Sequence, residues 1–107
     1  APFRDREPAA VARIDRLIRG TKIAGYVGCS RAIMQLDLTG RLGQVTCPVL
    51  VLVGEQDVGT PPAMAEEIAR AIPGARLETI AQAAHFANIE QPQRFNSLMQ
   101  QFYSRLA

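Results

Sequence analysis

The stretch Pro48-Val49-Leu50-Val51-Leu52-Val53-Gly54 decides the fold class of this 107-residue chain. Its apolar, largely β-branched residues follow one another without the polar alternation of a half-exposed strand. Such a run is typical of a strand that is buried on both faces in a parallel sheet. We therefore expect an α/β protein in which residues 48–54 form a buried strand.

The residues after this strand predict three further elements. Pro61-Pro62 begins a helix that ends at Pro73-Gly74 and is expected to carry three apolar residues inside: Met64, Ile68 and Ile72. Residues 75–80 form a second, shorter strand, and a loop with His85 follows it. The last helix begins near Pro92 and has the apolar spacing of a face that covers a sheet: Phe95, Leu98, Met99 and Phe102. The order strand, helix, strand, helix predicts the closing part of a doubly wound α/β fold.

Residues 1–46 have a different character, because they predict two helices with no strand between them. The first begins at Pro8 and ends at Gly20-Thr21, and the second runs from about residue 23 to residue 36. Two strands alone do not make a stable parallel sheet, since both faces and at least one edge need covering. We therefore expect the chain to be a fragment, with several strands preceding Ala1.

Composition and charge argue against several classes of function. The chain is 48% hydrophobic and 21% charged, and its net charge of +2 with scattered Arg residues predicts no nucleic-acid partner. The longest apolar run, Val49–Val53, is far shorter than the ~20 residues of a membrane helix. The charged stretch Phe3–Glu7 is unlike a signal peptide. Cys29 and Cys47 lack CxxC spacing, so we interpret them as buried thiols of a cytoplasmic protein.

Asp57 and His85 each follow one of the two predicted strands. Working residues of open α/β sheets lie in the loops just past the carboxyl ends of strands. The two residues are 28 positions apart, which is the length that one crossover helix occupies. A lone Asp57 is explained as a turn residue, and a lone His85 as a structural histidine. Together, at matching strand ends, they predict the acid and the base of a nucleophile–His–acid triad.

One stretch imitates the nucleophile elbow that such a pair needs. Gly28-Cys29-Ser30-Arg31-Ala32 reads G-x-S-x-A, and Ser30 precedes Asp57 and His85 in the expected order. The apolar residues before Ser30 are spaced as in a helix, however, and too few residues separate it from Cys47 to hold a strand and a crossover. We therefore expect Ser30 to lie on an amphipathic helix and the nucleophile to lie outside the chain.

The motifs named so far, with their neighbours, resemble the C-terminal third of α/β-hydrolases. The resemblance is carried by the strand 48–54, by Asp57, and by the loop that contains His85. Its finer detail is similar to the 3-oxoadipate enol-lactonase family, in three local phrases: Arg6-Glu7-Pro8, Gly25-Tyr26-Val27-Gly28-Cys29, and Ala83-Ala84-His85-Phe86-Ala87-Asn88-Ile89-Glu90-Gln91-Pro92. The resemblance spans nearly the whole chain.

This resemblance implies a division of the chain and a reaction. Residues 1–46 would be the tail of a helical cap, and residues 47–107 the last two parallel strands of the core with their helices. The intact enzyme would hydrolyse a lactone or ester of the β-ketoadipate pathway, with Asp57 as triad acid and His85 as base, and without a metal or organic cofactor. The N-terminal half of the same enzyme would be the partner that supplies the nucleophile. Because such a substrate carries a carboxylate, Arg31 is a candidate for substrate binding.

Three other interpretations compete with an enol-lactonase fragment. The chain could belong to a related α/β-hydrolase, namely an esterase, a dehalogenase or a cofactor-free haloperoxidase. It could be a noncatalytic hydrolase half that docks a partner, although a scaffold has no need of both Asp57 and His85. A flavodoxin-like ligand binder is disfavoured, because no Gly-rich phosphate loop follows a strand and the predicted strands are too few.

Overall fold

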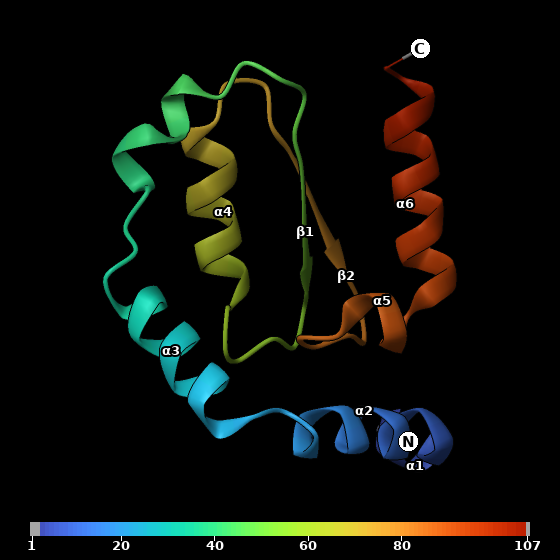
Figure 1. Ribbon diagram of the computed structural model, residues 1–107. Helices are drawn as coiled ribbons and strands as arrows, with labels where there is room; N and C mark the ends of the chain where they lie inside the picture. The colour runs from blue at the N-terminus through green and yellow to red at the C-terminus, as the bar shows by residue number, and fades with distance from the viewer. Residues whose placement is uncertain (1–2, 107) are drawn as a thin grey trace. The chain divides into compact units, whose positions relative to one another are not determined.

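The computed structural model describes residues 3–106 (Figure 1). Ala1, Pro2 and Ala107 lie outside the described residues, and with them the outer ends of the predicted segments 1–46 and 47–107. The chain divides into two compact units, one reaching to Asp37 and the other beginning at Leu38. The predicted boundary between Thr46 and Cys47 stays a prediction.

The described part of the first unit, residues 3–37, contains three helices. Helix α1 spans Phe3–Arg6, α2 spans Pro8–Arg19 and α3 spans Ile23–Met34. Pro8 starts α2 because a first-turn residue needs no N–H partner and the fixed φ of proline suits a helix. Both longer helices agree with the sequence prediction, whereas α1, a single turn, was not predicted from its charged sequence.

Both cysteines were predicted to be buried, and this prediction is wrong because both are exposed. Cys29 lies on α3, which has no buried residue, and Cys47 lies in the segment just before the first strand. Several large apolar side chains of the first unit are equally exposed, among them Ile23, Ile33 and Met34. Burial depends on a covering element, and within residues 3–37 no second layer of helices covers α3.

The second unit contains a parallel pair of strands between helices. Its elements are the 3₁₀ helix η1 (Thr39–Gln44), β1 (Leu50–Gly54), α4 (Pro62–Ala71), β2 (Arg76–Ile80), α5 (Ala87–Glu90) and α6 (Pro92–Ser104). Strands β1 and β2 pair in parallel, with Leu50 opposite Arg76 and Gly54 opposite Ile80. The two strands lie between α4 and α6 (Figure 1). The predicted order of strand, helix, strand and helix is confirmed, and the structure adds η1 and α5.

The core of this unit gathers where β2 ends. Ile80, Ala83 and Leu98 are almost fully buried, and Leu52, Ala87 and Phe95 pack against them. Leu98 belongs to the predicted apolar face of α6, whose remaining members are half-buried: Phe95, Met99 and Phe102. This helix face is therefore confirmed, and its packing anchors the segment that follows β2.

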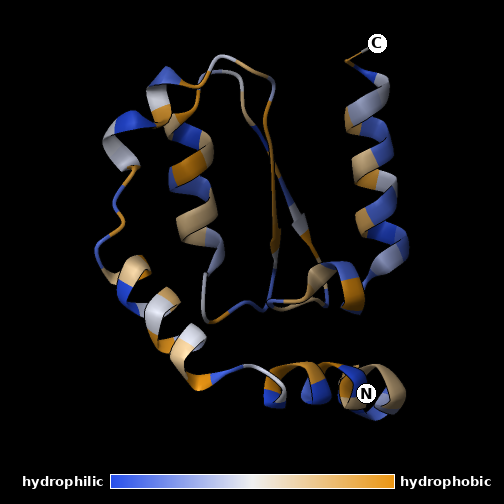
Figure 2. Ribbon diagram, viewed as in Figure 1, coloured by the Kyte–Doolittle hydropathy of each residue, from blue (hydrophilic) through white to orange (hydrophobic). Residues whose placement is uncertain are grey.

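Burial on the α4 side of the sheet is less complete than predicted. Met64 and Ile68 were expected inside, yet their side chains are 49% and 41% exposed. Strand β1 was expected to be buried on both faces, but only its end is buried and Leu50–Leu52 are half-buried. Figure 2 shows hydrophobic residues running along β1 all the same. The sequence carries the signature of a fully covered strand, but within residues 3–106 the sheet has only two strands.

The hydrogen bonds of β1 show which of its edges is open. The carbonyl of Val49 accepts the N–H of Arg76, and the N–H of Glu55 donates to the carbonyl of Ile80, each at 3.0 Å. Backbone groups alternate in direction along a strand, so the odd-numbered residues face β2. The N–H and C=O groups of Leu50 and Leu52 therefore point to the opposite edge, where no strand of the described residues pairs with them.

Candidate active site

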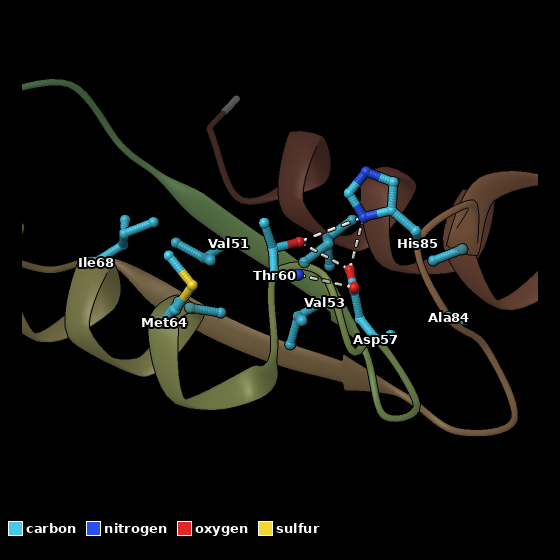
Figure 3. A pocket seen from close by; sticks show the side chains of 12 residues that line it. Val51, Val53, Asp57, Thr60, Met64, Ile68, Ala84 and His85 are labelled. Carbon is cyan, nitrogen blue, oxygen red and sulfur yellow. Dashed lines mark hydrogen bonds and ion pairs between the residues drawn. The ribbon is translucent and has the colours of Figure 1, made fainter. Parts of the chain in front are cut away.

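The carboxyl ends of β1 and β2 bring Asp57 and His85 together. Asp57 lies three residues beyond β1 and is 7% exposed, while His85 lies in the loop between β2 and α5. The Nδ1 atom of His85 lies 2.9 Å from Oδ2 of Asp57 (Figure 3). The two side chains are therefore in contact, and their roles as triad acid and base stay predictions.

Four donors converge on the Asp57 carboxylate. Oδ1 accepts the backbone N–H groups of Gly59 and Thr60, both at 2.9 Å. Oδ2 accepts the Thr60 hydroxyl at 2.8 Å and the ring N–H of His85. The Thr60 backbone N–H, the His85 ring, the Thr60 hydroxyl and the Gly59 N–H together hold the pKa of Asp57 well below its ordinary value, against the opposing effect of burial.

The lowered pKa of Asp57 predicts a pH dependence of stability. A carboxyl whose pKa is depressed by folding stabilises the folded state above its unfolded pKa, and this contribution is lost as the pH falls towards the folded pKa. We expect the free energy of unfolding to decrease as the pH is lowered below about 4, where ordinary carboxyl groups titrate. In Asp57→Asn this decrease should be smaller. Urea unfolding at several pH values between 2 and 7 measures both curves.

Asp15→Asn is the matched control for this prediction. Asp15 is exposed on α2 and pairs only with Arg19, four residues on, and exposed pairs of this kind contribute little to stability. The control should lose as much stability in acid as the parent protein does. An Asp57→Asn variant that loses stability in acid as steeply as the parent would contradict the hydrogen-bonded carboxylate described above.

The contact with Asp57 determines which nitrogen of His85 is free. An ionised carboxylate only accepts hydrogen bonds, so the proton of the neutral ring is on Nδ1. The described residues place no partner on Nε2, and the His85 side chain is 63% exposed. The ring also lies edge-on to Phe86, with ring centroids 5.8 Å apart. In this state His85 presents an unprotonated Nε2 that is able to take a proton from another group.

Glu90 holds the backbone on both sides of His85. Its two carboxylate oxygens accept the N–H groups of Ala84 and Phe86, each at 3.1 Å. Glu90 is the last residue of α5, and α5 packs beside α6 at the core of this unit. The backbone that carries the imidazole is thus tied to the helical layer rather than left as a free loop.

Gly54 allows the end of β1 to lie close to the backbone of the loop that contains His85. A side chain at this position would collide with the carbonyl oxygens of Ala83 and Ala84. The carbonyl of Ala83 accepts the N–H of Gln56 at 2.9 Å, which fastens the turn before Asp57 to the segment before His85. A residue without a Cβ is required here because two backbones meet.

A pocket of about 380 Å³ borders the Asp57–His85 pair. Figure 3 shows Val51 and Val53 of β1 and Met64 and Ile68 of α4 along one part of it, with Thr60, Asp57 and His85 at its polar end. Its lining is mostly apolar and includes residues of β1 and of α4. Within residues 3–106, no cluster of three or more His, Cys, Asp or Glu side chains is arranged to hold a metal ion.

The remaining residues singled out in the sequence lie in the first unit. Ser30 lies within the continuous helix α3, so the helical interpretation of the stretch 28–32 is confirmed and no strand-to-helix elbow exists there. Arg31 is exposed on the same helix, and its part in substrate binding stays a prediction. No helix among the described residues has the length and apolar character needed to cross a membrane.

Sequence reasoning missed three residues that build the site. Thr60 could have been suspected, because a hydroxyl three residues after Asp57 is close enough for a local side-chain contact. Gly54 was quoted only as the end of a strand, and its close approach to the Ala83–Ala84 backbone depends on the tertiary fold. Glu90 has its partners only four and six positions earlier, but its bonds to them require the single turn of α5, which no sequence repeat predicts.

Comparison with known proteins places this geometry in a family. The model of the alpha/beta hydrolase fold matches residues 8–92. The chain belongs to the α/β-hydrolase fold family. The predicted fold class, a C-terminal part of this fold, is thereby confirmed, and the two parallel strands with their helices are that part.

The relatives of this α/β-hydrolase chain include enol-lactonases. The 3-oxoadipate enol-lactonase 2 of Acinetobacter baylyi is 30% identical over 103 residues, which cover 96% of the chain and 38% of that protein. The crystal structure of the enol-lactonase from Burkholderia xenovorans LB400 superposes with a TM-score of 0.92 at 32% identity, covering 95% of this chain and 39% of the other. The predicted resemblance to enol-lactonases is therefore confirmed.

A third relative widens the range of activities. A thermophilic esterase from Thermogutta terrifontis is 36% identical with a TM-score of 0.63, and the match covers 64% of this chain and 25% of the esterase. The chain thus spans less than two fifths of the length of each of these hydrolases. The match therefore shows the fold family of this chain, and the activity of the whole protein is proposed below.

Proposed function

We propose that the full-length protein hydrolyses a carboxylic ester, most specifically 3-oxoadipate enol-lactone to 3-oxoadipate in the β-ketoadipate pathway of aromatic degradation. The observation that carries the proposal is the 2.9 Å contact between His85 Nδ1 and Asp57 Oδ2 at neighbouring strand ends. Two enol-lactonase relatives that match nearly the whole chain support the choice of substrate.

The proposed mechanism uses His85 and Asp57 as base and acid of a triad. A Ser hydroxyl from another part of the enzyme attacks the lactone carbonyl while Nε2 of His85 takes its proton. The imidazolium then gives this proton to the leaving enolate oxygen as the ring opens to an acyl-enzyme. Asp57 holds the ring with Nδ1 protonated and stabilises the imidazolium that forms. The neutral His85 next takes a proton from water as the water oxygen attacks the acyl carbon. It then returns that proton to the departing Ser oxygen, which releases 3-oxoadipate and restores the Ser hydroxyl. Each step is a proton or acyl transfer, so the mechanism calls on no cofactor.

The partner that completes the site is, in this proposal, the N-terminal part of the same enzyme. The open edge of β1 offers the backbone groups of Leu50 and Leu52 to one more strand. The apolar pocket between β1 and α4 would be covered by the same added part of the enzyme, together with Met64 and Ile68. Both features favour an added strand of the sheet, and the nucleophile would come with it.

The first unit has a proposed place in the same enzyme. Residues 1–46 would form the tail of a helical cap over the site, and 47–107 the end of the core. Arg31 would then contribute a guanidinium that pairs with the substrate carboxylate. We also propose that the enzyme works in the cytoplasm on a small-molecule substrate.

A plain esterase is the second candidate, favoured by the esterase relative. An assay of the full-length protein with 3-oxoadipate enol-lactone and with p-nitrophenyl acetate separates the two. We expect kcat/KM for the lactone to exceed that for the ester by roughly 100-fold or more, a difference of about 2.7 kcal/mol in transition-state binding. The isolated 107-residue chain should turn over neither.

Each other outcome of this assay has a definite meaning. Efficient ester hydrolysis without lactone hydrolysis would replace the enol-lactonase by the esterase. Turnover of neither compound by the full-length protein would reject both the enol-lactonase and the esterase, and would leave the dehalogenase, the haloperoxidase and the noncatalytic hydrolase half. Ester turnover by the isolated chain that Ser30→Ala abolishes would contradict the conclusion that the nucleophile lies elsewhere.

A further inference from the structure

Thr60 contacts both members of the Asp57–His85 pair. Its Oγ1 atom lies 2.8 Å from Oδ2 of Asp57 and 3.3 Å from Nδ1 of His85, and these two atoms are themselves 2.9 Å apart. The three side chains thus form a closed triangle of polar atoms (Figure 3). Neither the family match nor the triad scheme assigns a role to this hydroxyl.

The hydrogen atoms of the triangle can be placed by elimination. The carboxylate of Asp57 carries no proton, so both the Thr60 hydroxyl and the His85 ring N–H donate to its Oδ2. The hydroxyl oxygen keeps its lone pairs, so it can also accept the ring N–H as a second and weaker acceptor, at 3.3 Å from Nδ1. The hydroxyl therefore favours a proton on Nδ1 in two ways. It holds in place the carboxylate that accepts the Nδ1 proton, and it can accept this proton itself.

Thr60 also binds both oxygens of the Asp57 carboxylate. Its backbone N–H binds Oδ1 while its hydroxyl binds Oδ2, so rotation of the carboxylate breaks at least one of these bonds. The residue precedes Pro61, which restricts Thr60 to extended backbone conformations. The Thr60 side chain is exposed, so burial of its methyl group does not explain its position.

We propose that Thr60 is a positioning residue whose hydroxyl group fixes the Asp57 carboxylate and thereby keeps the His85 ring in its Nδ1-protonated tautomer. Its effect on turnover rests on the proposed hydrolase function, whereas its effect on the tautomer does not. Two carboxylates bind backbone groups near His85. The Glu90 carboxylate is bound by Ala84 and Phe86, and that of Glu55 accepts the N–H of Gln82.

Ring-nitrogen NMR measures the tautomer directly. His85 is the single histidine of the 107 residues, and comparison with His85→Gln identifies its imidazole ¹⁵N signals in the labelled full-length protein. With the ring neutral, the parent chain and Thr60→Ser should both show a protonated Nδ1 and an unprotonated Nε2. Thr60→Val, which keeps the shape and the backbone N–H but removes the hydroxyl, should shift a substantial population to the Nε2-protonated tautomer.

Kinetics of the full-length protein give the second readout. Loss of about one net hydrogen bond corresponds to roughly a tenfold loss in rate. We expect Thr60→Val to lower kcat by that factor with KM unchanged, and Thr60→Ser to restore kcat to within about twofold of the parent. A residue needed only for packing would not be rescued by Ser, because Ser lacks the methyl group.

The outcomes separate this proposal from the proposed function. A Thr60→Val chain with the parent tautomer, or a Thr60→Ser chain that behaves like Thr60→Val, would overturn the positioning role. Asp57→Asn serves as reference, since removing the charge should shift the tautomer at least as far. Altered tautomers in a full-length protein that hydrolyses no ester would keep the role of Thr60 and reject the hydrolase.

Discussion

His85→Ala is expected to reduce kcat/KM of the full-length protein for its ester or lactone substrate by roughly 10⁴-fold or more, because removal of a triad base leaves only binding and oxyanion stabilisation. Within residues 3–106 the imidazole has no substitute, because it is the single histidine and no other group of these residues binds its Nε2. Steady-state kinetics at neutral pH measure the loss, and thermal unfolding checks that the variant is folded.

Asp57→Asn tests the other half of the pair and should cost a similar factor. The exchange keeps the shape of the side chain, but in serine proteases the same change lowers kcat about 10⁴-fold because the base is held in the wrong tautomer. Asp15→Asn, at an exposed position of α2, is the matched control and should leave kcat/KM unchanged. Retention of more than a tenth of the parent activity by His85→Ala or Asp57→Asn would remove the triad roles assigned to them.

Gly54→Ala is expected to be the most damaging substitution outside the polar residues. The added Cβ would collide with the carbonyl oxygens of Ala83 and Ala84. The neighbouring atoms are backbone, which cannot rotate away as a flexible side chain can. Either β1 or the loop before His85 must move, at a cost of roughly 3 kcal/mol, the upper part of the range for overpacked sites. Denaturant unfolding measures the loss of stability.

Gly28→Ala is a suitable control for this prediction. Gly28 lies on α3 and a Cβ there meets nothing within 4 Å, so the same exchange should be neutral or stabilise the helix by about 0.5–1 kcal/mol. The two variants add the same methyl group in contrasting surroundings. A Gly54→Ala protein as stable and as active as Gly28→Ala would show that the two backbones are not held in close contact.

Local sequence was sufficient to predict the elements that place the site. The apolar run before Gly54 and the apolar spacing of α6 follow the regular repeats of a strand and a helix. The two Pro residues mark where α4 begins. The meeting of Asp57 with His85 followed from a topological rule, that parallel strands end at one edge of the sheet. No knowledge of individual contacts was needed for either prediction.

Contacts that form only after the backbone has folded were beyond the reach of the sequence. The clamp of Glu90 on Ala84 and Phe86 becomes visible only once α5 is in place, and α5 itself is too short to show a helical repeat. The wrong predictions for Cys29 and Met64 share another cause. Both residues have a buried character in sequence, yet burial requires covering elements that residues 3–106 do not provide.

Covalent labelling with a fluorophosphonate tests the central claim, that Asp57 and His85 serve a Ser supplied by another part of the enzyme. Such probes modify a Ser only when its base and acid activate it. In the full-length protein, peptide mass spectrometry should find the label on a Ser outside the 107 residues, and His85→Ala should abolish it. A label on Ser30, or labelling that persists undiminished in His85→Ala, would contradict the claim.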